Sequence, residues 1–379
     1  MFATVWCSRP ILNAPLLAIQ ILLLGPLPGV AGAAARDQRD LTLPEPNGRH
    51  QVGTTAFVVT DVRRHRDLAL TMWYPAAAQA AADAPYMDDM TADALAKEWK
   101  LAPNFQRRVH THAVLRATLD SGGPFPIVLL EHGSSAVPAL YTILAEGLAS
   151  SGFIVVATNH PPDSLISAFP DGHVLRFTPY WPEDADRRSQ GIAIGRFATE
   201  VLAADVRFVL DELLRMHASD RIWRGHLDPV RVGIVGHSMG GTTAAVALAT
   251  DARIVAGINL DGSTYPGMND DVRPIPLRKP FLFIATSDHA AGETKAREFV
   301  GKKGDTYYAT MAGADHMSFT DAPLLSSKFG PHSKRSDAAF QQGVLLSTHT
   351  RTLTEEFFAK YLRGEDAPDL DATATVDKE

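Results

Sequence analysis

The sequence predicts an α/β fold, in which helices cover both faces of a mostly parallel eight-stranded sheet. Eight short runs have the composition of strands, and the later ones are almost unbroken apolar runs, as is typical of parallel strands buried on both faces. Several segments between them have helical length and amphipathic spacing. The strand-like runs are 54–60, 68–74, 125–131, 153–158, 230–235, 254–260, 281–286 and 306–310, and the helical segments include 140–149, 197–214 and 242–249.

The predicted strands form two groups. The runs 54–60 and 68–74 alternate polar and apolar residues and lie close together, as an antiparallel pair does. The later strands alternate with helices, as in a parallel sheet with helical crossovers. We therefore expect a single folded domain at 51–365, between a flexible lead-in at 36–50 and a disordered tail at 366–379.

Two long insertions, 76–123 and 160–196, interrupt this alternation. Loops of such length in a compact domain usually carry function or are disordered, and aromatic residues argue against disorder. We predict that 160–196 forms a cap over a functional site; the alternative is that its aromatic side chains pack on the core. The prolines and aromatic residues of this segment are Pro161, Pro162, Pro170, Pro179, Pro182, Phe169, Phe177, Tyr180 and Trp181.

The first 35 residues have the pattern of a secretory signal peptide. Arg9 precedes the largely apolar run 11–24, and small residues follow at 31–35. An uncleaved anchor fits less well, because the run is short and broken by polar residues and a proline. The single cysteine, Cys7, lies within this segment. We expect an exported protein, periplasmic or extracellular, whose mature chain has no disulfide, no cysteine nucleophile and no stable membrane insertion.

The composition of the 379-residue chain limits its possible functions. It is 45% hydrophobic and 21% charged, with a net charge of −7, as expected for a globular protein with a sizeable core. No block of lysine and arginine and no basic-aromatic pattern occurs. Nucleic-acid binding therefore has no electrostatic basis in this sequence.

The most informative motif is Gly-His-Ser-Met-Gly-Gly at 236–241. It follows the apolar run 230–235 and precedes the alanine-rich segment 242–250. A strand, a Gly-x-Ser-x-Gly turn and a helix in this order form a nucleophile elbow, which exposes the serine hydroxyl at the head of the helix. The motif alone occurs by chance in glycine-rich proteins, but its flanking segments favour covalent catalysis by Ser238.

A serine nucleophile needs a general base, and the best candidate is His316. It lies in the segment 313–319, which follows the last predicted strand and begins with small residues that permit a turn. The other histidines after the elbow fit less well. His289 follows the preceding strand, His332 lies in a polar stretch, and His349 falls within a predicted helix.

Two aspartates are candidates for the acid that orients the base. Asp261 ends the sixth strand and Asp288 follows the seventh, so both lie at the carboxyl edge of the sheet. Most hydrolases with this architecture place the acid after the seventh strand, which favours Asp288. Asp315 fits less well, because the side chain next to His316 in sequence seldom reaches its ring in such a loop.

Two backbone amides are expected to form the oxyanion hole. One is that of Met239, at the start of the helix, and the other is that of Ser134, in the loop after the third strand. Although His132 precedes Ser134, no set of His, Asp and Glu with metal-ligand spacing accompanies it. The predicted chemistry requires no metal and no cofactor.

Several segments resemble a known family, the secreted platelet-activating-factor acetylhydrolases and their bacterial relatives described as predicted dienelactone hydrolases. The similarity extends from about residue 53 to 362 and implies the alpha/beta-hydrolase fold. In this family the acid follows the sixth strand in a Leu-Asp motif, so the resemblance favours Asp261 over Asp288. The similar segments are 70–75, 129–134, 148–155, 231–241 and 260–262.

These observations predict an exported serine hydrolase that cleaves small-molecule carboxylic esters, including lipid-like ones, through an acyl-enzyme. Ser238, His316 and Asp261 would form its catalytic triad. One alternative is a lactone or amide hydrolase with the same triad, because the acyl chemistry is shared. Another is a non-catalytic binding protein on a hydrolase scaffold.

Overall fold

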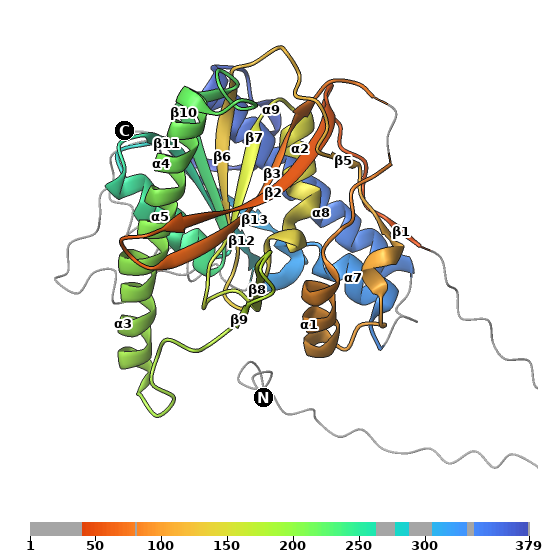
Figure 1. The fold of residues 1–379 in the computed structure, drawn as a ribbon, viewed down its shortest axis with the longest axis vertical. Helices are drawn as coiled ribbons and strands as arrows, with labels where there is room; N and C mark the ends of the chain where they lie inside the picture. The colour runs from red at the N-terminus through yellow and green to blue at the C-terminus, as the bar shows by residue number, and fades with distance from the viewer. Residues whose placement is uncertain (1–39, 80–81, 263–276, 288–304, 332–336, 378–379) are drawn as a thin grey trace, which may run out of the picture. The chain divides into compact units, whose positions relative to one another are not determined.

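The computed structural model describes residues 40–79, 82–262, 277–287, 305–331 and 337–377, which belong to one compact unit, Asp40–Glu379. A ten-stranded sheet lies at its centre, in the order β14-β13-β12-β11-β10-β6-β7-β3-β2-β5 (Figure 1). The strands are β2 (Gln51–Asp61), β3 (Arg66–Ala76), β5 (Ala113–Leu115), β6 (Phe125–Glu131), β7 (Ile154–Asn159), β10 (Leu227–His237), β11 (Ile254–Leu260), β12 (Phe281–Thr286), β13 (Thr306–Met311) and β14 (Thr375–Asp377).

The sheet confirms the predicted mixture of parallel and antiparallel pairing. The six strands from β13 to β7 in the sheet order are all parallel, and β2 pairs with β3 in antiparallel register. All eight predicted strands are present. The two additional strands, β5 and β14, have three residues each, too few to produce a recognisable pattern.

Helices cover both faces of the sheet and bury two apolar cores (Figure 1). On one face lie α1 (Asp89–Trp99), α2 (Thr142–Ser150), α7 (Ala322–Phe329) and α8 (Asp337–Phe358). On the other lie α4 (Ala203–Ser219) and α5 (Met239–Thr250). Every residue of β6 is buried, because its alternate side chains enter the two cores. This is why the central strands have no polar face in the sequence.

The chain reverses its winding direction between β6 and β10, which are neighbours in the sheet. From β6 the chain passes through α2 to β7, and from β10 it passes through α5 to β11 on the opposite side. Loops after strands that diverge in this way leave a crevice at their carboxyl ends, where α/β proteins place their ligands. The loop after β6 and the turn after β10 therefore face each other across a site.

The ends of the domain differ from the prediction. Residues Leu41 and Leu43 are buried, and β1 (Leu41–Thr42) pairs with β4 (Val109–His110), so the folded chain begins before residue 51. Residues 366–377 are not a disordered tail: α9 (Pro368–Thr373) buries Leu370 completely, and β14 pairs with β13. Pairing with distant segments orders both ends, and their polar, proline-containing sequences do not reveal such pairing.

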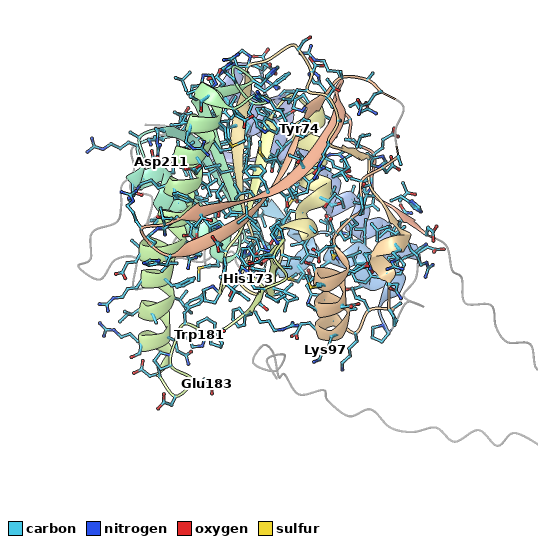
Figure 2. The ribbon with its side chains drawn as sticks, in the orientation of Figure 1. Tyr74, Lys97, His173, Trp181, Glu183 and Asp211 are labelled. Carbon is cyan, nitrogen blue, oxygen red and sulfur yellow. The ribbon has the colours of Figure 1, made fainter. Side chains whose placement is uncertain are left out.

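The insertion 160–196 contains the hairpin of β8 (Ile166–Ala168) and β9 (Val174–Arg176), followed by α3 (Arg187–Phe197). A π-helical turn at Ala198–Leu202 joins α3 to α4, and Figure 1 shows the two as one long helix. Trp181 and Glu183 lie at the outer end of α3 in Figure 2. Within the described ranges, no helix has both the length and the apolarity needed to cross a bilayer.

The remaining short helices connect the larger elements. They are η1 (Phe105–Arg108), η2 (Pro138–Tyr141), η6 (His316–Phe319) and η7 (Ala359–Arg363). Two of them matter for the site, because η2 follows the loop after β6 and η6 follows the loop after β13. The signal-like segment 1–35 and the first four residues of the lead-in, 36–39, lie outside the described residues.

Candidate active site

Ser238 occupies the sharp turn between β10 and α5. Its backbone has φ 56° and ψ −117°, a conformation that non-glycine residues rarely adopt and that characterises a nucleophile elbow. The turn is possible because its neighbours have no side chains. A Cβ atom on Gly236 would lie 2.0 Å from the carbonyl oxygen of Gly240, and one on Gly240 would lie 2.1 Å from that of Glu131.

A row of hydrogen bonds joins Ser238, His316 and Asp261. The Ser238 hydroxyl lies 2.9 Å from Nε2 of His316, and the Nδ1 of His316 lies 2.7 Å from Oδ2 of Asp261. The three residues come from the carboxyl ends of β10, β13 and β11. Such an arrangement allows the imidazole to accept the serine proton while the carboxylate stabilises the resulting positive charge.

Hydrogen bonds from the end of the neighbouring strand β12 hold the side chain of Asp261 in place. Its side chain is completely buried, and its Oδ1 accepts hydrogen bonds from the amide of Thr286 at 2.9 Å and from its hydroxyl at 3.2 Å. Oδ1 is engaged at the end of β12, and Oδ2 bonds to His316. The carboxylate therefore has one orientation.

The loop that carries His316 is stabilised by its own short helix. Asp315 caps η6: its carboxylate accepts hydrogen bonds from the amide of Met317 and the hydroxyl of Ser318. The Asp315 carboxylate thus stabilises the backbone next to His316. Asp288, His289 and His332, the other candidates from the sequence, lie outside the described residues, and His349 lies in α8.

The loop after β6 lies directly against the nucleophile. A Cβ atom on Gly133 would be 3.2 Å from the Cβ of Ser238. The carbonyl of Gly133 accepts hydrogen bonds from the amide of Ala136 at 3.0 Å and from Nδ1 of His132 at 2.8 Å. Because C=O and N–H point in opposite directions in a planar trans peptide, these two bonds also fix the direction of the Ser134 amide.

His132 can donate from Nδ1 because its other nitrogen is occupied as an acceptor. Its Nε2 accepts hydrogen bonds from the Ser164 hydroxyl at 2.8 Å and from the amide of His160 at 3.2 Å. Burial and the nearby charge of His160 lower the pKa of the His132 imidazole to about 3. His132 is thus a neutral side chain that supports the loop, a role that the sequence did not reveal.

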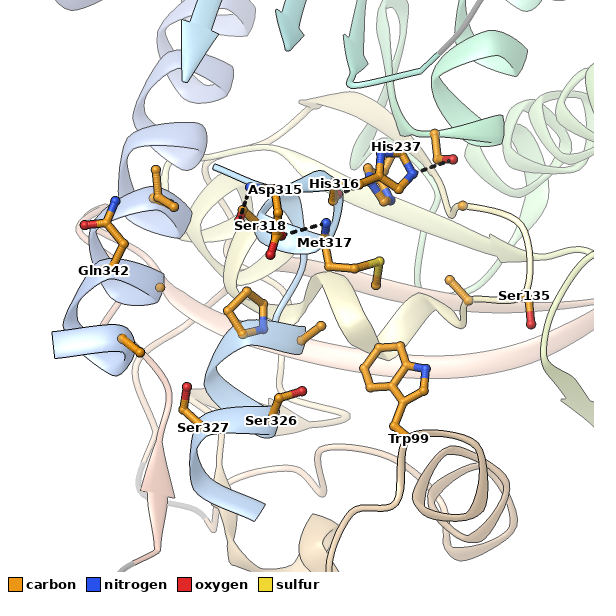
Figure 3. Close-up of a pocket in the computed structure, with 18 of the residues that line it drawn as sticks. Trp99, Ser135, His237, Asp315, His316, Met317, Ser318, Ser326, Ser327 and Gln342 are labelled. Carbon is orange, nitrogen blue, oxygen red and sulfur yellow. Dashed lines mark hydrogen bonds between the residues drawn. The ribbon is translucent and has the colours of Figure 1, made fainter. Parts of the chain in front are cut away.

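The pocket at the hydroxyl of Ser238 has a volume of about 550 Å³. Trp99 at the end of α1, Met317, and residues of α7 and α8 such as Ser326 and Gln342 surround it (Figure 3). We expected 160–196 to cover the site. In the described part of the chain, however, no residue of this insertion lines the pocket, and the first insertion contributes Trp99 instead.

One aromatic residue of 160–196, Tyr180, packs beside the site. Tyr180 stacks on Phe197 with ring centroids 3.8 Å apart, and both lie against the buried side chain of Met239. The start of α5 is therefore supported by an apolar cluster. The amide of Met239 is at the first position of this helix, where N–H groups have no partner within the helix.

A buried charge cluster lies beneath the loop after β6. Nε2 of His160 is 2.5 Å from Oε2 of Glu131, and its Nδ1 is 3.0 Å from Oδ2 of Asp205 on α4. Asp205 also accepts a hydrogen bond from Arg66 at 2.6 Å. Burial alone lowers the pKa of the His160 imidazole, but the charge of Glu131 and the hydrogen bond to Asp205 outweigh it and raise this pKa to about 9.

This cluster makes the stability of the fold depend on pH. Because the folded-state pKa of His160 lies above its ordinary value of 6.5, its stabilisation is complete below about pH 6.5 and is lost as the pH rises through about 9. Relative to His160→Gln, we expect the wild-type free energy of unfolding to fall by about 1.4 kcal/mol per pH unit in this range. Urea unfolding at several pH values measures this dependence. If the free energy of unfolding of both proteins had the same slope against pH, the raised pKa of His160 would be contradicted.

Across the described ranges, no group of three or more His, Cys, Asp or Glu side chains is placed to hold a metal ion. Within these ranges, the side chains suited to catalysis are Ser238, His316 and Asp261, which lie in the crevice at the carboxyl ends of the strands. Three residues that contact its loops were not singled out from the sequence: Thr286, which bonds to Asp261; Tyr141, whose hydroxyl bonds to the amide of Gly133; and His237, whose ring bonds to the carbonyl of His316. Only His237 could have been noticed, because it lies inside the Gly-x-Ser-x-Gly motif.

The sheet, the elbow and the crevice define an α/β-hydrolase. A family model described as "Platelet-activating factor acetylhydrolase, isoform II" matches residues 35–170 and 206–336, and the chain belongs to this family. The resemblance seen in the sequence is thereby confirmed.

Relatives of known name agree with this assignment. The chain is 26% identical over 311 residues to a platelet-activating factor acetylhydrolase of Cavia porcellus, with 76% of this chain and 70% of the relative covered. It is 28% identical over 142 residues to a probable 1-alkyl-2-acetylglycerophosphocholine esterase of Arthroderma benhamiae, with 37% of this chain and 32% of the relative covered.

A solved structure is similar along most of the chain. It is a ferulic acid esterase from Streptomyces cinnamoneus, with a TM-score of 0.73 and 27% sequence identity, and 89% of this chain and 100% of that chain are covered. The relatives and this structure are all named as acetylhydrolases or esterases. The protein is a carboxylic ester hydrolase.

Proposed function

We propose that the protein is an exported serine esterase that acts through a Ser238–His316–Asp261 triad and an acyl-enzyme intermediate. One observation carries the proposal: the unbroken row of hydrogen bonds from the Ser238 hydroxyl through the imidazole to the buried Asp261. A hydroxyl at an elbow, a base within reach and an oriented carboxylate are the components of this mechanism.

In the first half of the reaction, Nε2 of His316 takes the proton of Ser238 as the oxygen attacks the ester carbonyl. The imidazolium is stabilised by Asp261, which becomes its counter-ion. The carbonyl oxygen gains negative charge and accepts hydrogen bonds from the amides of Met239 and Ser134. Each such donor contributes about 3 kcal/mol to stabilisation of the transition state.

The tetrahedral intermediate then collapses, and His316 returns the proton to the departing alcohol. Water takes the place of the alcohol in the second half. His316 removes a proton from this water, the hydroxide oxygen attacks the acyl-enzyme, and Ser238 leaves with the proton from the imidazole. The products are an alcohol and a carboxylic acid, and no cofactor takes part in either half.

The substrate is proposed to be a small-molecule ester whose acyl group enters the pocket beside Trp99 and Met317. The relatives are named for the acetyl group of platelet-activating factor or for ferulic acid, so ester bonds are common to them while acyl groups differ. The apolar side chains at the pocket favour an uncharged acyl group. Lactones and amides remain the second candidate class, since the triad would act on the same carbonyl.

The proposal is tested by covalent labelling. A fluorophosphonate should form one adduct, and peptide mass spectrometry should locate it on Ser238, with loss of p-nitrophenyl ester hydrolysis in proportion to labelling. An adduct at another serine would assign the nucleophile elsewhere. Hydrolysis without any labelling would exclude a serine mechanism.

Export is proposed from the signal-like segment at 1–35. When the full chain is expressed in a bacterial host, we expect the mature protein outside the cytoplasm, with an N-terminus close to residue 36. N-terminal sequencing of the fractionated protein measures this. Full-length protein confined to the cytoplasm would refute export without affecting the assignment of the esterase site.

A further inference from the structure

One buried tyrosine connects the loops that surround Ser238. The hydroxyl of Tyr141, at the end of η2, lies 2.9 Å from the amide nitrogen of Gly133 and 2.9 Å from Nδ1 of His237. On its other side, Nε2 of His237 lies 2.8 Å from the carbonyl oxygen of His316. This hydrogen-bond chain therefore runs from the loop after β6, through the residue preceding Ser238, to the backbone of the base.

The two ends of the chain determine where every hydrogen lies. An amide N–H can only donate, so Gly133 donates to the Tyr141 oxygen. A carbonyl can only accept, so Nε2 of His237 must carry a hydrogen and donate it to His316. A neutral imidazole then has no hydrogen on Nδ1, which accepts the hydroxyl proton of Tyr141.

The surroundings favour the neutral ring that this arrangement requires. Both side chains are buried: Tyr141 is 1% exposed and His237 is 2% exposed. Burial, together with the nearby ring of His316, lowers the pKa of the His237 imidazole to about 3. Burial also raises the pKa of the Tyr141 hydroxyl, which keeps its proton. The chain thus has one set of hydrogen positions as long as the His237 ring is neutral.

We propose that Tyr141 and His237 are positioning residues that hold the oxyanion loop and the base loop at fixed places relative to Ser238. The inference rests on the proposed function, since it assigns a purpose to contacts around the proposed triad. The hydrogen bonds of both side chains go to each other and to backbone groups. Tyr141 holds the amide of Gly133, one peptide before the Ser134 amide, and His237 holds the peptide that carries the base.

The geometry explains why three loops need such a connection. They end three different strands, β6, β10 and β13, and β13 is not a neighbour of β6 or β10 in the sheet. Misplacement of a reacting group by about 1 Å costs about 100-fold in rate. A buried chain of three hydrogen bonds restricts this movement, while the aromatic rings fill the space beneath the site.

The test is Tyr141→Phe, which removes the hydroxyl and keeps the ring. We expect kcat for a p-nitrophenyl ester to fall by about 10- to 100-fold with little change in KM, because the loops lose their positions but the pocket remains. The affinity for a boronic acid, whose adduct with Ser238 places an oxygen in the oxyanion hole, should fall by the same factor as kcat/KM.

The matched control is Tyr74→Phe. Tyr74 is labelled in Figure 2. Its hydroxyl is also buried and donates to a backbone carbonyl, that of Ala117, at 2.8 Å, but its ring lies in the other core, against Trp223. This variant should lose a comparable amount of stability and retain wild-type kcat and boronate affinity. If Tyr141→Phe keeps the kcat of the control, the positioning role is wrong.

A double-mutant cycle tests whether the chain acts as a unit. His237→Asn keeps an acceptor near the Nδ1 position for Tyr141 and loses the donor to His316. The combined loss of kcat in the double variant should be smaller than the product of the single losses, because either change breaks the same chain. Multiplicative effects would overturn the inference. If Ser238→Ala retained activity, the proposed function would fail instead, whatever the result at Tyr141.

Discussion

We expect Ser238→Ala to lower kcat for p-nitrophenyl esters by about 10⁴- to 10⁶-fold, the range found when a serine hydrolase loses its nucleophile. The hydroxyl oxygen is the atom that bonds to the acyl carbon, so no neighbouring group can replace it within the row of hydrogen bonds. Any remaining hydrolysis would come from water activated by His316 and from the oxyanion amides. Fluorophosphonate labelling should disappear together with turnover.

The same substitution should leave the fold intact. Ser238 adopts φ 56°, and alanine has the same difficulty with this conformation as serine, so the turn is not strained further. The apolar contacts of Met239 and the glycines of the elbow are unchanged. Thermal unfolding should therefore show a melting temperature close to that of the wild type.

Ser135→Ala is the matched control for this experiment. Ser135 also has a positive φ, 57°, and lies in the oxyanion loop beside the pocket, where its amide donates to the carbonyl of Asp163. Its side chain has no part in the proposed mechanism, so kcat should stay within about threefold of the wild type. Substantial activity in Ser238→Ala, or its loss in both variants, would refute the assignment of the nucleophile.

Local sequence patterns predicted much of the fold and two of the three triad candidates. The elbow is visible because strand, glycine turn and helix are adjacent in the chain, and His316 stands out because it follows the last strand of the parallel series. Both inferences need only the order of elements, since parallel strands bring their carboxyl ends to one edge. The acid could not be assigned in this way, because aspartates follow two of these strands.

Contacts between residues far apart in the chain could not be predicted from the sequence. Tyr141 bonds to His237 across 96 positions in the chain, and its neighbours in the sequence give no sign that it does so. Leu370 is a single large apolar residue in an acidic stretch, yet α9 buries it against the domain. In each case burial by other elements, rather than a local pattern, gives the residue its role.

The choice between the two acids leads to the second large expected effect: Asp261→Asn should lower kcat by about 10⁴-fold, as the same change does in serine hydrolases. Oδ1 of Asp261 accepts two hydrogen bonds from Thr286, so the oxygen of an asparagine amide would stay at that position. The amide nitrogen must then face Nδ1 of His316, which becomes an acceptor. The ring hydrogen moves to Nε2, and the imidazole can no longer take the proton of Ser238.

The expected loss of kcat comes from the changed position of the hydrogen on the His316 ring and not from a change in the fold. Activity can therefore be measured separately from stability. Asp261→Asn should keep the wild-type ester KM within about threefold, because the asparagine has the shape of the aspartate and the pocket is unchanged. Asp315→Asn is the control, since its carboxylate accepts from the amide of Met317 and not from the ring. Asp288→Asn completes the set. If that variant lost activity and Asp261→Asn retained it, the acid would follow β12 rather than β11, and the Asp261 hydrogen bond would be structural.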